Sequence, residues 1–476
     1  MKRHTILGLV LVAMIVICTS GCTTHTRKMV ELRPMLTAGN VEGALLLVDK
    51  GMGKKETLLA ELERGLILHH DHRWDESNVC FERAERLAEE LYGTSISESA
   101  VSLFTNAAQK SYRARPFELA MVPYYRALNY LFLGYPDEAM VEVRKASLLL
   151  ANHIDATLGA IDRGDTRNLA RTRSDPFLLY LAGMFYDWDG ELNDAFISYR
   201  NAAVAYQDLT GLLGVQIPPW LGQDLERVAA RLGFVGELDQ LRESCPSVFR
   251  AAGNASSRSP GSDRGELILF VENGWIAAKG EWSASVPIYK GDRFASNPLS
   301  ASAISKRIGD GRVIVRKGAK TVYWLPLALP TEPKTDSESI RAVIRGAGQT
   351  ARSVRVHHPS ANAVITADAE WQKVVFETAL RALAKYVTYL QAKDKGGFLG
   401  GLASNIFNAA TEIADTRSWL SLPDEIQMVR VSLPEGVHEL EMRLEDTSGR
   451  TLGTVLLPPV TVRAGDWTFL SHRVYD

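Results

Sequence analysis

The stretch LAGMFYDWDGELNDAFISYRNA, residues 181–202, carries the pattern that decides the fold of the first half of the chain. It has small residues at Gly183 and Ala195, large residues at Tyr186 and Tyr199, and a further alanine at Ala202. Apolar residues recur at helical spacing on both sides of WDGE, a group of residues typical of a turn. The stretch therefore predicts two helices joined by a short turn.

The same spacing occurs twice more upstream: a small residue, a large one at +3, a small one at +12, a large one at +16 and alanine at +19. The members are Gly65, Leu68, Ser77, Phe81 and Ala84 in one unit, and Ala127, Tyr130, Ala139, Val143 and Ala146 in the other. This signature resembles the tetratricopeptide repeat, whose small residues let paired helices approach closely. The +12 residues are 62 and 56 positions apart, against about 34 in a tandem array, so we expect extra segments near 95–112 and 152–175.

Stacked helix pairs of this kind leave a concave surface. The resemblance implies that this groove binds a protein partner, and it maps the groove onto Tyr124, Leu128, Tyr180, Met184 and Asp187. The alternative is that these side chains pack against neighbouring helices, because an aromatic stripe on a helix usually belongs to a core.

A change of period divides the chain after the repeats. We expect a helical repeat domain over 22–245, closed by two helices within 218–241, then a polar linker over 246–265 and a β-rich domain over 266–476. Strands are predicted at ELILFVE (266–272), RVIVR (312–316), TVYWLPL (321–327) and 440–444, with two more around the AGD turn near the C-terminus. The predicted fold class is α+β: a tetratricopeptide-like α-solenoid followed by an antiparallel, β-sandwich-like domain.

A helical hairpin interrupts the predicted strands at about 370–414. Its two helical runs flank the glycine-rich sequence KGGFLGGL, residues 395–402. The tip could enter a membrane or a partner, or the hairpin could pack on the sheet. The hairpin is too short and polar to span a bilayer.

The N-terminus combines Lys2 and Arg3 with the apolar run ILGLVLVAMIVIC and then Thr-Ser-Gly before Cys22. The run is about 13 residues long, which is typical of a secretory signal rather than a membrane span. The order resembles the bacterial lipobox, which implies a signal peptide over 1–21 and acyl chains on Cys22; the alternative is an ordinary signal with a chance cysteine. The residue directly after Cys22 is Thr23, whereas an aspartate at this position would resemble a signal for retention in the inner membrane. We therefore expect attachment to the outer membrane, facing the periplasm.

The lipobox, the degenerate repeats, the apolar first strand and ADTRSW (414–419) followed by LP together resemble a family of poorly characterised lipoproteins of Gram-negative envelopes. The resemblance implies outer-membrane attachment and a link to peptidoglycan synthase activation, and it brings no catalytic residues. We expect Asp415 and Arg417 to pair where the hairpin re-enters the sandwich, and Trp419 to fill the layer beneath.

Other clusters are weak candidates for chemistry, and we predict no metal or cofactor. Adjacent histidines point in divergent directions, whereas a zinc site needs three or four converging ligands. Interspersed acids make an arginine-rich connector typical of a solvated loop rather than an anion site. Cys80 and Cys245 could form a periplasmic disulfide or remain buried thiols. The clusters are His69, His70, Asp71 and His72; His357 and His358; and Arg163, Arg167, Arg171 and Arg173.

A net charge of −2 and the lack of a concentrated basic run argue against a nucleic-acid partner. The leading interpretation is a non-enzymatic, lipid-anchored periplasmic scaffold that binds a protein partner of cell-envelope assembly through its repeats. One alternative is an enzyme acting on envelope glycan, with the repeats supplying specificity. Another is a membrane-remodelling protein that uses the glycine-rich tip, residues 396–401. The partner and the oligomeric state stay open.

Overall fold

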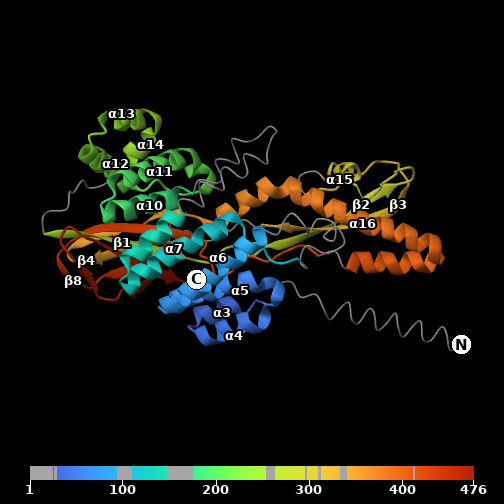
Figure 1. Cartoon of the computed structure of the whole chain (residues 1–476), viewed down its shortest axis with the longest axis horizontal. Helices are drawn as coiled ribbons and strands as arrows, with labels where there is room; N and C mark the ends of the chain where they lie inside the picture. Colours follow the sequence, from blue (N-terminus) through green and yellow to red (C-terminus); the bar gives the residue numbers. More distant parts are fainter. Residues whose placement is uncertain are drawn as a thin grey trace.

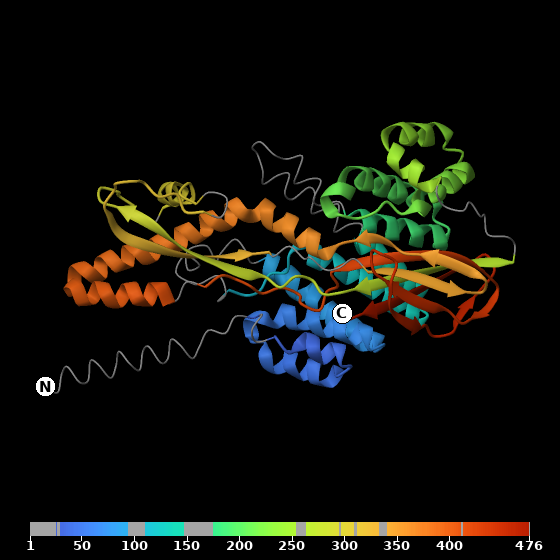
Figure 2. The ribbon, with the colours of Figure 1, turned by 180° about the vertical axis from the view of Figure 1, so that it is seen from behind.

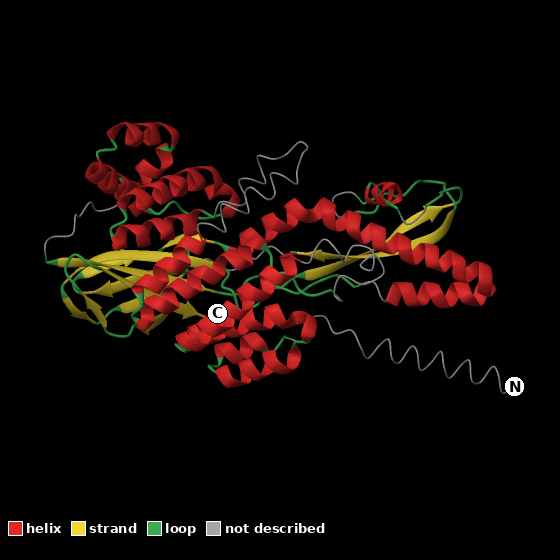
Figure 3. Cartoon of the chain, viewed as in Figure 1, coloured by secondary structure: helices red, strands yellow, loops and turns green. Residues whose placement is uncertain are grey.

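The computed structural model describes residues 25, 29–93, 110–146, 175–253, 263–294, 297–308, 312–332, 340–410 and 413–475. Among the residues that the structure describes, helices account for 53% and strands for 23%, so the protein is a mixed α and β protein. Helices make up the N-terminal region, and strands in sheets follow toward the C-terminus (Figure 3). Figure 1 shows a body of helices and sheets from which a long arm projects.

The helices of the first half begin and end at residues suited to those positions. Proline occupies the first turn of several, where its missing N–H costs nothing, and Gly134, Gly190, Gly214 and Gly233 adopt positive φ at helix C-termini. Residues 136–146 are also helical. The named elements are α3 (Leu32–Thr37), α4 (Val41–Gly51), η1 (Lys54–Glu56), α5 (Thr57–His70), α6 (Trp74–Gly93), α7 (Pro116–Leu133), α10 (Pro176–Asp189), α11 (Leu192–Leu213), α12 (Pro219–Leu232), α13 (Val235–Ser244) and α14 (Pro246–Ala252).

The repeated spacing has a direct packing reason. A Cβ added to Gly65 of α5 would lie 2.6 Å from Cε1 of Phe81 in α6, and one added to Gly183 of α10 would lie 2.3 Å from Cδ1 of Tyr199 in α11. Each glycine thus lets an aromatic ring 16 residues later rest directly on the backbone of its partner helix. The Ser77 hydroxyl at +12 donates a hydrogen bond to the Gly65 carbonyl at 2.6 Å.

Two four-stranded sheets form the β part of the body, in the orders β12-β1-β7-β6 and β10-β9-β4-β5. The β1–β12 pair is parallel, whereas the expected domain was antiparallel; the other pairs are antiparallel. The strands are β1 (Arg264–Asn273), β4 (Arg341–Gly346), β5 (Gln349–Arg352), β6 (Val354–His357), β7 (Glu425–Pro434), β8 (Gly436–His438), β9 (Glu441–Glu445), β10 (Thr451–Leu456), β11 (Val460–Val462) and β12 (Trp467–Val474).

Strand β1 is buried on both faces, which explains its continuous apolar run. Leu267, Leu269 and Val271 pack into a cluster with residues of the second sheet. Ile268 and Phe270 point the other way and join a large cluster that contains the helices from α5 to α14. The helical and β parts of the body therefore share one hydrophobic core, with β1 between them.

The arm has its own apolar core. It consists of β2 (Gly280–Tyr289), α15 (Pro298–Ser305), β3 (Thr321–Thr331) and α16 (Pro359–Ala410), where β2 and β3 form an antiparallel hairpin. Residues of all four elements form a cluster separate from that of the body, including Ile288, Ile304, Leu325 and Leu383. The views in Figures 1 and 2 agree that the arm extends away from the sheets and that α16 doubles back near its C-terminal end.

Two predicted boundaries and one predicted strand differ from the structure. Helix α16 begins at Pro359 rather than at about 370, and α14 occupies the first residues of the expected linker. RVIVR is not a strand: Val313 makes an isolated bridge to Ile308, while Ile314 and Val315 are exposed, and no strand of the described part of the chain pairs with this loop. Within the described ranges, none of the helices combines the length and apolarity required to cross a membrane.

Candidate functional site at the base of the arm

The predicted groove is interior rather than open. Tyr124, Leu128, Tyr180, Met184 and Asp187 are all buried, the most accessible being Asp187 at 9% exposed. The prediction that these five residues bind a partner is therefore wrong for this structure, because the chain itself covers them.

Strand β1 and helix α12 supply the covering groups. The Tyr124 ring packs against Phe270 of β1, with 5.9 Å between ring centroids, and its hydroxyl donates to Glu272 Oε1 at 3.1 Å. The Tyr180 hydroxyl donates to Asp224 Oδ2 of α12 at 2.8 Å. Sequence periodicity identified these side chains as one face of the helices, but it could not show what lies against that face.

Buried carboxylates join the helices to the β part. Glu272, fully buried, accepts hydrogen bonds from Tyr124 and Tyr125, and burial raises its pKa. Glu63 of α5 accepts from the backbone N–H groups of Leu420 and Ser421 at 2.6 and 3.1 Å. Because a buried carboxylate without donors would be strongly destabilising, these pairings fix how the helices dock on the sheet.

The ADTRSW segment follows α16 and packs against the helical region. Arg417 donates to both carboxylate oxygens of Asp415 at 2.8 and 2.7 Å, the pair that the sequence predicts, and also to the Lys110 carbonyl at 2.9 Å. Trp419 is fully buried in the body core, and its backbone N–H donates to Glu118 Oε1 at 3.0 Å. The Trp lies against Phe81 and so fills a layer shared with helices rather than one beneath the sheets alone.

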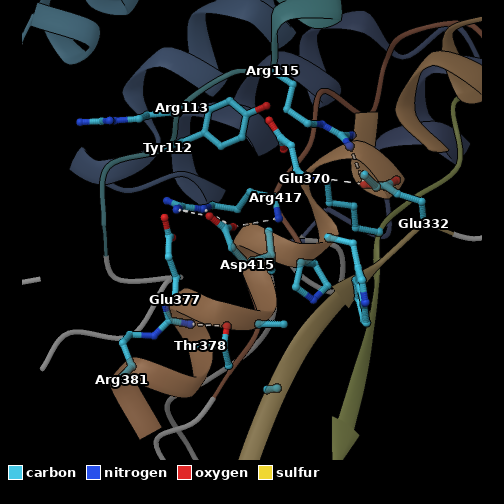
Figure 4. A pocket seen from close by; sticks show the side chains of 17 residues that line it. Tyr112, Arg113, Arg115, Glu332, Glu370, Glu377, Thr378, Arg381, Asp415 and Arg417 are labelled. Carbon is cyan, nitrogen blue, oxygen red and sulfur yellow. Dashed lines mark hydrogen bonds and ion pairs between the residues drawn. The ribbon is translucent and has the colours of Figure 1, made fainter. Parts of the chain in front are cut away.

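A pocket of about 210 Å³, with many ionisable residues in its lining, lies where the arm joins the body (Figure 4). Four separate parts of the chain line it: the segment before α7, the ends of the β2–β3 hairpin, α16 and the ADTRSW segment. Its ionisable residues are Tyr112, Arg113, Arg115, Lys279, Glu332, Glu370, Glu377, Arg381, Asp415 and Arg417.

The inner wall of the pocket crowds two cations around one carboxylate. Arg115 Nη1 lies 2.7 Å from Glu332 Oε1, and Lys279 Nζ lies 4.0 Å from the same oxygen. Burial lowers the pKa of Lys279, with Arg115 adding repulsion, and burial raises the pKa of Glu332. Arg115 Nε and Nη2 and Glu332 Oε2 are buried and find no hydrogen-bond partner among the described residues. The inner wall thus holds two donors and one acceptor that the described residues leave without a hydrogen bond.

The outer wall comes from one side of α16. Glu370 and Glu377 are exposed at the rim, and Arg381 donates to Thr378 at 2.9 Å. Figure 4 shows these helix residues facing Tyr112 and the Asp415–Arg417 pair across the pocket. The lining thus combines charged groups with apolar ones such as Trp371, a mixture typical of ligand pockets.

The histidine clusters make interior contacts. His69 Nδ1 lies 2.6 Å from Asn129 Oδ1, and burial lowers the pKa of His69 to about 4. His70 Nε2 lies 3.4 Å from Glu272 Oε2. His357 Nδ1 lies 3.1 Å from Asp175 Oδ2, and His358 Nδ1 lies 3.0 Å from the Leu213 carbonyl oxygen. In the part of the chain that the structure covers, no group of side chains is arranged to hold a metal ion.

Several predicted features lie outside the described residues: Cys22 with the signal segment, and the arginine-rich connector at Arg163, Arg167, Arg171 and Arg173. Cys80 and Cys245 are described, and both are buried free thiols. Comparison with known protein families and with curated protein sequences finds no match to this chain.

Sequence reasoning named two of the ten ionisable residues of the pocket, Asp415 and Arg417. Arg115, Lys279 and Glu332 were missed because they come from segments far apart in the chain. The one local signal was ADTRSW, whose clustered polar residues follow a helix and precede a buried strand.

Proposed function

We propose that this chain is a non-enzymatic, lipid-anchored scaffold at the periplasmic face of the outer membrane, built from a tetratricopeptide-like solenoid and a β-sandwich-like unit. The pocket at the base of the arm, rather than the covered helical face, recognises its protein partner in envelope assembly. The sequence resemblance extends the proposal to regulation of peptidoglycan synthesis.

One observation carries the proposal: Arg115 and Glu332 line a pocket shared by the body and the arm, and the described residues leave two donors of Arg115 and one acceptor of Glu332 without a hydrogen bond. A peptide segment supplies a carbonyl acceptor and an N–H donor together, so it can satisfy both residues. A partner seated there would contact the arm and the body at once. It would thereby set the arm's position, which is the action expected of a scaffold.

Site-specific photo-crosslinking of the full lipidated chain in intact cells tests the proposal. A photoreactive residue replaces Glu370 at the pocket rim, and a control chain carries it at the exposed Glu237 of α13. We expect a discrete protein adduct from position 370 that Arg115→Gln abolishes, and none from position 237. The same adducts from both positions, or none from position 370, would refute the assignment of the pocket.

An enzyme acting on envelope glycan is the second candidate. Its support is the Glu332 carboxyl group, which lines the pocket and whose pKa is raised by burial, the direction that a general acid requires. The purified chain should then release soluble fragments from peptidoglycan, and Glu332→Gln should remove the activity while leaving the fold intact. Fragments that persist undiminished with Glu332→Gln would remove the basis of this candidate.

A further inference from the structure

The outer part of the arm is strongly basic around the β2–β3 hairpin and α15. Residues 287–324, here called the arm head, contain eight Lys and Arg against two Asp, a net charge of +6 in a chain whose total is −2. Seven of these cations are exposed: Lys290, Arg293, Lys306, Arg312, Arg316, Lys317 and Lys320. Asp292, the acid described in this segment, is already paired with Arg307 at 2.8 Å. The exposed charge of the arm head is therefore almost entirely positive.

The same segment exposes large apolar side chains. Strand β3 alternates, so that Tyr323 and Leu325 face the arm core while Val322 and Trp324 face outward. The loop before β3 and the N-terminus of α15 add aliphatic residues to this exposed set. The exposed fractions are Leu299 84%, Val315 62%, Ile314 57%, Trp324 53% and Val322 51%.

The fold holds these residues in place at the end of the hairpin. The Arg316 N–H donates to the Tyr289 hydroxyl at 2.6 Å, and the Lys290 N–H donates to the Lys320 carbonyl at 2.8 Å, which ties the loop to the ends of β2 and β3. The guanidinium of Arg316 also lies 5.3 Å from the Tyr289 ring centroid. Figure 1 shows α15 and the β2–β3 hairpin in the outer part of the arm, away from the sheets of the body, with the turn of α16 reaching farther still.

We propose that the arm head docks on the surface of a bilayer rich in anionic phospholipid. Lys and Arg near such a surface are attracted by its negative potential, and Trp and aliphatic side chains gain by entering the boundary between headgroups and acyl chains. Aliphatic residues have no ring with which to stack on bases or sugars, so the mixture favours lipid over a nucleic acid or a glycan polymer. This inference goes beyond the proposed function and does not depend on the partner pocket.

Flotation with vesicles tests the docking. The protein is the chain from residue 23 onward, which lacks both the leader and Cys22; within the described ranges the first residue of a hydrophobic cluster is Met29. Vesicles contain equal parts phosphatidylglycerol and phosphatidylcholine, or phosphatidylcholine alone. We expect binding to the anionic vesicles only, weakening as salt rises. Reversing three arm-head charges, with Arg312→Glu, Lys317→Glu and Lys320→Glu, should weaken binding on the order of 100-fold.

A control variant reverses three exposed arginines of the body, with Arg200→Glu, Arg231→Glu and Arg250→Glu, which changes the net charge equally. It should bind as the unmodified chain does, and circular dichroism confirms that each variant is folded. Trp324→Ser should weaken binding about tenfold, whereas deletion of residues 396–401 should not change it. The inference would be overturned if the two triple variants lost vesicle binding equally, or if the unmodified chain did not bind anionic vesicles. Binding to isolated peptidoglycan instead of vesicles would overturn it too. None of these outcomes affects the crosslinking result at position 370.

Discussion

Single residues at helix crossings decide how the helix pairs form. Gly183 has no room for a side chain because a Cβ there would meet the ring of Tyr199 at 2.3 Å. We predict that Gly183→Ala lowers the free energy of unfolding by about 1–3 kcal/mol, because the ring must move within a packed core. Urea denaturation measures this change.

Gly211 of α11 offers a matched control, since a Cβ there would meet no atom within 4 Å. Gly211→Ala should leave stability unchanged or raise it by up to about 1 kcal/mol, because alanine is the better helix former. If Gly211→Ala lowered the free energy of unfolding as much as Gly183→Ala does, this explanation of the repeated spacing would be contradicted.

Buried histidines should make the protein sensitive to acid. The pKa of His69 is lowered to about 4 by burial, below its ordinary value of 6.5, so the unfolded chain binds a proton more readily than the folded one. Stability should therefore be complete above pH 6.5 and fall as the pH drops toward 4, by up to about 3 kcal/mol for this residue.

Between pH 7 and pH 4.5, the free energy of unfolding of His69→Gln should fall by less than that of the unmodified chain. Urea denaturation at both pH values measures this difference. The variant is compared with its own stability at pH 7, so a general destabilisation does not affect the comparison. An identical loss in the two proteins would show that His69 stays neutral in the unfolded chain as well, or that it is accessible when folded.

At the scale of elements, the arm and the body have separate apolar cores. Leu325 of β3 and Leu225 of α12 are both fully buried, one in each core. We predict that Leu225→Ala lowers the global free energy of unfolding by about 2–5 kcal/mol, whereas Leu325→Ala speeds hydrogen exchange in the arm and leaves exchange in the body almost unchanged. Mass spectrometry compares the hydrogen-exchange rates of peptides from β3 and from α12. If Leu325→Ala sped exchange equally in both peptides, the cores would not be separate.

How far the sequence predicts these elements depends on whether the signal is local. The Gly–aromatic spacing is local to a helix pair, so α10 and α11 could be predicted, and the double-faced apolar run of β1 could be recognised for the same reason. The covering of Tyr124 by β1 could not, because it joins residues that are far apart in the chain. The same holds for the pocket, where Arg115 and Glu332 meet across 217 positions.

At the scale of the whole molecule, one core joins the helices to the sheet and leaves the arm as the projecting part. Helix α10 contributes Phe177 and Tyr180 to this core, and β1 contributes Phe270. Because the apolar face of the helices is already filled, we propose the pocket and the arm head as the places that contact other molecules. A shared core also requires the helical and β parts to unfold together.

Hydrogen exchange followed by mass spectrometry at increasing urea shows whether the two parts unfold together. Peptides covering 176–189 in α10 and 264–273 in β1 should show the same opening free energy and the same dependence on urea, because loss of either element exposes the shared core. If α10 stays protected after β1 has opened, the helical region stands alone with an exposed apolar face, and the claim of a shared core fails.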